Sequence, residues 1–239
     1  MIELAEWVAR RRGEAVRVRG PDPRGVTPSI RDLGAALRAG RQDLVGIPTL
    51  SPPHEGAGRD LAQRALSADV AALAFATGPA WGGSLAGMRA ASEGLPATPI
   101  LLLDPVVSEG QVLEGRLAGA DAVTLPVAFL DKAELRRLAQ AARSTLMTPV
   151  FLVRTPEEWE RARDADSKFL LAALPSGDLA ETAELLSRLP VRVPACVWAN
   201  GLDTPRALAS LAGRADGALL GLGFPVDAWP EVAVVEARP

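Results

Sequence analysis

The sequence predicts an α/β fold, a (β/α)8 TIM barrel with an N-terminal helical extension, and three observations support this prediction. After residue 43, short apolar runs alternate with helix-like segments at spacings of about 20–30 residues. Eight such runs occur, and a chain of 239 residues suits eight strand–helix units. The runs are continuously apolar, as expected for parallel strands that are covered on both faces. An open doubly wound sheet is the alternative that this pattern leaves.

We expect the eight apolar runs to be the barrel strands in chain order. They are 44-LVGIPTL-50, 70-VAALAFA-76, 99-PILLL-103, 122-AVTLPV-127, 149-PVFLV-153, 169-FLLAAL-174, 194-PACVWA-199 and 217-GALLGL-222. The segments between them have the period of helices. Segment 109–120 is expected to align Val112, Leu113, Arg116 and Leu117 along one side.

Two further segments carry helix-start signals. Segment 131–144 begins at an Asp suited to capping a helix N-terminus, and segment 204–213 has Thr at the cap, Pro in the first turn and Gly at its end. We expect a single domain over residues 1–239, with 1–43 as the helical extension and 44–239 as the barrel. The stretch 20-GPDPRG-25 is interpreted as a turn within the extension.

Composition limits the chemistry that the chain can perform. Cys196 is the single cysteine and His54 the single histidine, so no disulfide, cysteine cluster or multi-histidine metal site is expected. The basic residues are 24 Arg against two Lys, Lys132 and Lys168, which leaves few candidates for lysine chemistry. We expect no metal and no cofactor.

The same composition limits the partners. A net charge of −3 gives no reason to expect nucleic acid binding, and no apolar run is long enough to cross a membrane. The N-terminal segment mixes charges into an amphipathic pattern and lacks the apolar core of a signal peptide, so we expect a cytoplasmic protein.

Six segments, in order along the chain, resemble motifs of the indole-3-glycerol phosphate synthase family of tryptophan biosynthesis. That family has a (β/α)8 barrel, and the resemblance covers nearly the whole chain. Each motif alone is weak, but six at the right spacing make a specific match. The segments are LAEWVARRRGEAV near the N-terminus, 51-SPPHEG-56, 81-WGGSL-85, 119-GADAVTLPVAFL-130, 153-VRTPEEWERA-162 and 216-DGALLGLGF-224.

The departures from the family pattern fall on the residues that the resemblance makes catalytic. The family closes an indole ring by decarboxylation and dehydration, using Lys and Glu at strand ends as acid, base and charge stabiliser. Matched to this chain, every ionisable group of that set becomes apolar, Pro or Gly, and only Asn200 stays polar. The matching positions are Gly46 and Pro48, Leu103, Leu152, Pro175 and Gly177, and Ala199 with Asn200.

Four polar residues are candidates for substitute chemistry. Asp104 ends the third strand and matches an Asp of the family, although a carboxylate there also suits capping of the following turn. Arg154 follows the fifth strand and either meets an anion or pairs with Glu157 or Glu158. His54 lies in the first loop, and Asn200 follows the seventh strand. Cys196 lies inside a strand and is expected to pack in the core.

The phosphate end of the family site is partly kept. Gly201 and Gly221 match the glycines whose backbone N–H groups hold phosphate after the last two strands, and Ser51 matches the serine of the first loop. Leu222 stands where the family has a polar residue. The glycines are equally suited to making tight turns.

The aromatic end of the site is more apolar than the family pattern. We expect Trp81, Leu103 and Leu152 to line the barrel mouth, together with Leu125, Pro126 and Leu174. Such a mouth is either filled by its own side chains or forms a pocket for an uncharged ligand.

Three functional hypotheses remain open. The first is a family member without catalytic residues that works as a binding, regulatory or scaffold protein, with a phosphorylated or aromatic small molecule or another protein as its partner. The second is an enzyme with altered lyase or isomerase chemistry at the barrel top. The third is retained synthase activity, which needs a Lys or Glu at the barrel mouth.

Overall fold

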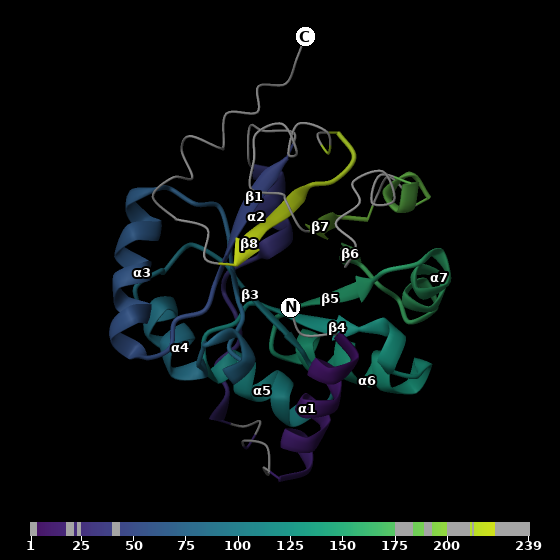
Figure 1. Ribbon diagram of the computed structural model, residues 1–239, viewed down its shortest axis with the longest axis horizontal. Helices are drawn as coiled ribbons and strands as arrows, with labels where there is room; N and C mark the ends of the chain where they lie inside the picture. Colours follow the sequence, from purple (N-terminus) through teal and green to yellow (C-terminus); the bar gives the residue numbers. More distant parts are fainter. Residues whose placement is uncertain are drawn as a thin grey trace.

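Eight parallel strands close into a barrel in the order β1 to β8, with β8 paired to β1 (Figure 1). The computed structural model describes residues 4–17, 22, 25–39, 44–174, 184–188, 193–199, 211 and 213–222. The predicted barrel is confirmed and the open sheet is excluded. The strands are β1 Val45–Leu50, β2 Leu73–Phe75, β3 Ile100–Pro105, β4 Ala122–Pro126, β5 Thr148–Val153, β6 Leu170–Leu174, β7 Ala195–Ala199 and β8 Gly217–Leu222.

An α-helix follows each of the strands β1 to β5, and these five helices lie outside the ring of strands (Figure 1). In each, the residue before the helix accepts a hydrogen bond through its side chain from a backbone N–H three residues on, which fixes where the helix starts. The predicted cap at Asp131 is confirmed, while segment 204–212, apart from residue 211, lies outside the described residues. The helices are α3 Glu55–Ser67, α4 Leu85–Glu93, α5 Glu109–Leu117, α6 Lys132–Ser144 and α7 Pro156–Asp164.

The side of segment 109–120 on which Val112, Leu113, Arg116 and Leu117 were expected to align is only partly buried. Val112 and Leu113 are buried, but Leu117 is 40% exposed. The helix ends at Leu117 because Gly119 takes a positive φ of 93°, which a glycine adopts readily and which stops the helical repeat.

The barrel carries two separate apolar cores. The outer core lies between strands and helices and includes Phe75, Leu102 and Phe151 from strands with Met88 and Leu138 from helices. Among the described residues, the helices that follow the strands contribute nothing to the inner core, and successive strand residues alternate between the two cores. Its strand members are Val45, Ile47, Ala74, Leu101, Leu103, Ala122, Val150, Leu152, Leu171, Ala173, Cys196 and Leu219.

The N-terminal extension reaches both ends of this inner core. Its first helix, α1 Leu4–Arg17, contributes Trp7, and its second, α2 Leu33–Ala39, contributes Leu33 and Leu37. Figure 1 shows α1 crossing the ring on the side of β4 and α5. Two 3-10 turns, η2 Pro79–Trp81 and η3 Val127–Phe129, follow β2 and β4 on the same side as α1.

Hydrogen bonds place α1 at the carboxyl ends of the strands. Arg11 donates from Nε to the carbonyl of Pro105, the last residue of β3, over 3.3 Å. Gln111 of α5 donates to the carbonyl of Arg11 over 2.7 Å, and Arg12 donates to the carbonyl of Phe129. The helix therefore lies across the barrel mouth, the end at which barrel enzymes place their active sites.

A buried ionic cluster fixes the chain at the opposite end of the barrel. Asp121, the residue before β4, is fully buried and forms ion pairs with Arg31 Nε at 2.7 Å and Arg116 Nη1 at 2.8 Å. It also accepts hydrogen bonds from Ser29 Oγ and from the backbone N–H of Ile100. Because Ser29 and Arg31 belong to the extension, this cluster attaches the extension to the barrel floor.

We predict that Asp121→Ala strongly destabilises the fold. Removing the carboxylate leaves Arg31 and Arg116 buried without their counter-charge, a change that costs about 3–5 kcal/mol in comparable sites. Denaturant unfolding at neutral pH measures the loss. Asp164→Ala, which breaks an exposed pair with Lys132, is the matched control and should leave stability close to that of the unmodified protein. Equal losses of stability in the two variants would contradict a stabilising role for the buried ionic cluster.

Candidate functional site

The first strand presents other residues to the barrel interior than the sequence comparison predicted. Gly46 is in register with Ala218, a member of the outer core, so it faces the helices. Ile47 and Thr49 face inward instead, because their register partners Leu219 and Ala74 belong to the inner core. The predicted matches at Gly46 and Pro48 are therefore wrong.

The loop after β1 allows a second match to the family, displaced by one residue. Segment 51–56 has six residues where the family motif Ser-Pro-Ser-x-Gly has five. A one-residue shift moves every side chain of a strand to its other face. The chemical conclusion is unchanged, since neither Ile47 nor Thr49 can ionise to serve as an acid or a base.

The two leucines at the predicted catalytic positions do face the interior. Leu103 on β3 and Leu152 on β5 are each 2% exposed and belong to the inner core with Trp7. Leu125 was predicted beside them, but it lies in the outer core and faces the helices. The described part of the mouth is thus filled by packed side chains rather than open between them.

Three tryptophans meet above these leucines. The Trp7 ring of α1 lies 5.2 Å from the Trp81 ring and 6.3 Å from the Trp198 ring, centroid to centroid, in tilted and edge-on arrangements. Such geometries are the favourable ones for aromatic pairs. Trp7 is only 3% exposed. The predicted role of Trp81 at the mouth agrees with its position, whereas Trp7 and Trp198 carried no local sequence signal.

Asp104 braces the rim of the barrel. It is fully buried and accepts hydrogen bonds from the backbone N–H groups of Thr77 at 2.6 Å and Gly78 at 2.9 Å, and from the Thr77 hydroxyl. These donors follow β2, so the prediction that Asp104 caps the turn after its own strand is wrong. Burial raises the pKa of the carboxyl above its ordinary 3.8, against the lowering effects of the Thr77 N–H and the Arg11 charge.

His54 and Arg154 are engaged in local structure. His54 is the N-cap of α3, and its Nδ1 accepts the backbone N–H of Ala57 at 3.2 Å, which requires that nitrogen to be unprotonated. Arg154 pairs with Glu158 at 2.9 Å, as one of the predicted alternatives had it, and lies over the Phe129 ring. Among the residues that the structure describes, no hydrogen bond or ion pair joins Asp104, His54 and Arg154 to one another.

The remaining ionisable candidates do not reach the interior. Lys132 pairs with Asp164 and Lys168 with Asp166, and both lysine side chains are more than half exposed. Cys196 is fully buried in the inner core, as predicted, and burial raises the pKa of its thiol so that it is no nucleophile.

The predicted phosphate residues are only partly described. Ser51 and Gly221 lie at the carboxyl ends of β1 and β8, which are neighbouring strands. The backbone of Leu222 ends β8, while Gly201 and Asn200 lie outside the described residues, as do Pro175 and Gly177. Space around Gly221 is open, since an added Cβ would meet no atom within 4 Å. Phosphate binding therefore stays a prediction.

The described residues include neither a metal-binding cluster nor a membrane-spanning helix. No group of three or more His, Cys, Asp and Glu side chains in this part of the chain is arranged to hold a metal ion. None of the helices described here is long and apolar enough to span a membrane.

An apolar, closed (β/α)8 barrel with a helical extension across its mouth is the class of protein that these features define. Comparisons with known proteins identify the family. The sequence model for indole-3-glycerol phosphate synthase matches residues 53–221. The chain belongs to the indole-3-glycerol phosphate synthase family.

Curated relatives extend the match to most of the chain. The chain is 33% identical over 221 residues to the indole-3-glycerol phosphate synthase of Saccharopolyspora erythraea, covering 87% of this chain and 82% of that protein. It is 31% identical over 247 residues to indole-3-glycerol phosphate synthase 1 of Streptomyces coelicolor, covering 97% and 89%.

Solved structures share the fold. A 3-hexulose-6-phosphate synthase matches with a TM-score of 0.63 and 21% identity, over 80% of this chain and 100% of that one. The tryptophan synthase alpha subunit of Legionella pneumophila matches with a TM-score of 0.58 and 16% identity, over 83% and 87%. At these identities the likeness concerns the barrel alone.

We predict that Asp104 titrates above 3.8 and the exposed Asp164 below it, because burial dominates at Asp104 while a hydrogen bond from Lys132 favours the charged form of Asp164. Carboxyl carbon NMR resonances followed against pH measure both values. The folded protein then binds the Asp104 proton more tightly than the unfolded chain. The stability that Asp104 contributes through this proton is therefore fully present below pH 3.8. It is lost as the pH rises through the raised pKa of Asp104. A pKa of Asp104 below that of Asp164 would contradict this prediction.

Proposed function

We propose that this chain is a member of the indole-3-glycerol phosphate synthase family that no longer performs ring closure and acts as a binding, regulatory or scaffold protein. The observation that carries the proposal is the pair Leu103 and Leu152. They face the barrel interior where the family resemblance implies an acid and a base, and both are buried in a continuous apolar core.

The chemistry of ring closure explains why this pair matters. Protonation of a leaving hydroxyl and removal of a ring proton need groups that exchange protons near neutral pH. Leucine exchanges none, and each lost acid or base typically costs about 10²–10⁴ in rate. The rate losses from several missing groups do not add fully. The loss from the first missing group nevertheless remains in full.

The position of α1 is a second observation that supports the proposal, because it limits access to the barrel interior. Trp7 fills the described part of the mouth against Trp81 and Trp198, so a substrate ring could enter through this part only if α1 moved. That movement would expose an apolar core and break the bonds of Arg11 and Arg12 to the rim. Binding energy spent on opening the mouth is lost to catalysis.

Synthase activity is the second candidate, because the curated relatives bear that name. It would make the chain a carbon–carbon lyase of tryptophan biosynthesis. This candidate requires proton-transfer groups that the described interior positions do not supply. Altered lyase chemistry is less supported, since Asp104, His54 and Arg154 are each held in separate local contacts.

We predict no formation of indole product from the family substrate, the carboxyphenylamino-deoxyribulose phosphate. The missing acid and base at Leu103 and Leu152 are the physical reason. Absorbance of the indole ring, followed with purified protein, measures turnover, and the Streptomyces coelicolor relative serves as the positive control.

Calorimetry with the same substrate separates the alternatives. A finite heat of binding without sustained heat means that ligand recognition outlives catalysis. Sustained heat, together with indole absorbance, would establish synthase activity and overturn the proposal. No heat at all is compatible with a protein partner or another small molecule as the binding target.

A further inference from the structure

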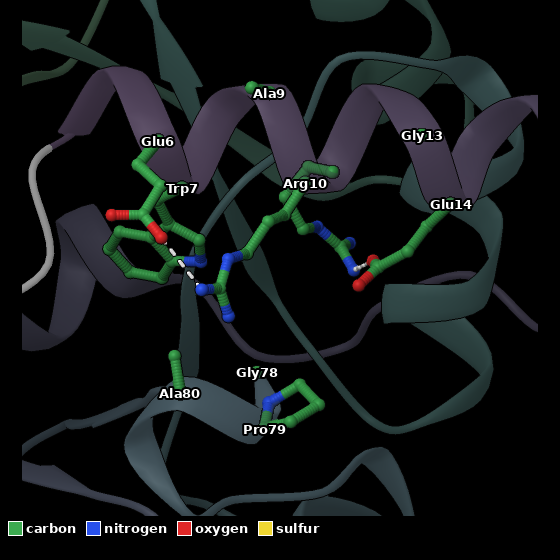
Figure 2. Close-up of a pocket in the computed structure, with 10 residues that line it drawn as sticks. Glu6, Trp7, Ala9, Arg10, Gly13, Glu14, Gly78, Pro79 and Ala80 are labelled. Carbon is green, nitrogen blue, oxygen red and sulfur yellow. Dashed lines mark hydrogen bonds and ion pairs between the residues drawn. The ribbon is translucent and has the colours of Figure 1, made fainter.

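A groove of about 470 Å³ lies between α1 and the turn η2, beside the closed mouth (Figure 2). This volume is within the range of about 300–1,000 Å³ that small-molecule sites occupy. The groove exists because the residues on its walls and floor are small. They are Ala9, Gly13, Gly78, Pro79 and Ala80.

Gly78 shows that the groove is maintained by its surroundings. A Cβ at this position would lie 2.9 Å from Oδ1 of Asp104 and 3.5 Å from Nε1 of Trp7. A larger residue would collide with the rim brace and fill the groove below the indole nitrogen. The glycine therefore leaves room beside the buried N–H group that a side chain at this position would take up.

That N–H group has no acceptor among the described residues. Trp7 Nε1 is buried without a hydrogen-bond partner, although the residue is only 3% exposed. Figure 2 shows the indole nitrogen on the side of the ring that faces the Arg10 side chain. A buried donor without an acceptor is costly, so this end of the groove favours a ligand that brings an acceptor oxygen.

The charges in the groove are balanced. Arg10 pairs with Glu6 at 2.7 Å and Arg11 with Glu14 at 2.7 Å, so the four charged residues of the groove sum to zero. A simple anion would meet Glu6 beside Arg10 and be repelled. A ligand with both charges close together finds a partner for each.

The Glu6–Arg10 pair can open for such a ligand at little cost. Both side chains are more than half exposed, and exposed pairs of this i,i+4 type contribute little to stability. A carboxylate then accepts hydrogen bonds from Arg10 and Trp7 Nε1, while an ammonium group donates to Glu6. One weak ion pair is exchanged for two, and the unpaired indole N–H gains its acceptor.

We propose that this groove binds a small zwitterion, an α-amino acid with an apolar side chain. The head group lies at Glu6, Trp7 and Arg10, and the side chain packs on Ala9 and Pro79. Bound there, the amino acid bridges α1 and the loop after β2 and stabilises the closed barrel mouth by mass action. The site lies outside the barrel interior, so the proposal holds whether or not the barrel catalyses a reaction.

Calorimetry of the full chain at neutral pH tests the proposal with L-phenylalanine as the probe. Two relatives of the probe each lack one charge: 3-phenylpropionate lacks the ammonium group and phenethylamine lacks the carboxylate. We expect saturable binding of L-phenylalanine, weakened about tenfold or more for either relative, because each loses a charge-assisted pair. Absence of saturable binding at millimolar concentrations, or equal binding of 3-phenylpropionate, would overturn the proposal.

Matched variants locate the site. Arg10→Gln should weaken L-phenylalanine binding about tenfold or more, since it removes the carboxylate partner. Arg59→Gln removes an arginine from an equally exposed i,i+4 pair with Glu55 on α3, away from the groove, and should leave affinity unchanged. Equal effects of the two substitutions would show that the binding is elsewhere.

An NMR readout in the unmodified protein makes the test independent of folding defects. The indole N–H resonance of Trp7 is assigned by its absence from the spectrum of Trp7→Phe. We expect it to move downfield as L-phenylalanine saturates the protein, because the N–H gains a charged acceptor. Saturation without movement of this resonance would contradict the proposed pose.

Discussion

The burial of Trp7 in the core of the barrel is the contact on which the rest of the structure depends. A (β/α)8 barrel that keeps charged groups at its mouth must leave room for water and substrate around them. Here Leu103 and Leu152 occupy interior positions near the mouth, and the indole ring of α1 packs above them with Trp81 and Trp198. Removing buried charges in favour of apolar contacts commonly stabilises a fold. In the function proposed for this chain, the same exchange removes the groups that would transfer protons.

The N-terminal extension contacts the inner core at both ends of the barrel. At the mouth, Arg11 and Arg12 attach α1 to the carbonyls of Pro105 at the end of β3 and Phe129 after β4. At the other end, Arg31 joins Asp121, and Leu33 of α2 enters the inner core. One segment of chain thus closes both ends of the same apolar column. A small ligand in the groove beside α1 would act on the mouth without entering the barrel.

Much of the fold could be predicted because continuous apolar runs and capping residues are local signals. The apolar run 169–174 and the Asp131 cap correspond closely to β6 and the start of α6. The facing of β1 could not be predicted in this way, because a comparison displaced by one residue assigns every side chain of a strand to the opposite face. Leu103 and Leu152 do face the interior, since both belong to the inner core.

The site was harder to predict because its contacts join distant parts of the chain. The donors to Asp104 are Thr77 and Gly78, which follow another strand. The residues next to Asp104 in the sequence therefore suggested only that its carboxylate caps a turn. Trp7 lies in a helix whose pattern shows an apolar face but not the surface that receives it. Which end of a barrel an extension covers depends on such contacts and not on local periodicity.

Hydrogen exchange at the backbone of α1 tests the central claim most directly. If Trp7 closes the barrel as part of its core, the amides of α1 exchange slowly, approaching the protection of β5, and Trp7→Ala speeds exchange in α1 more than in β5. If α1 is only loosely attached, its amides exchange at the rate of a fraying terminal helix in the unmodified protein, and Trp7→Ala changes nothing. That result would contradict a closed barrel mouth and would favour catalysis in the barrel interior.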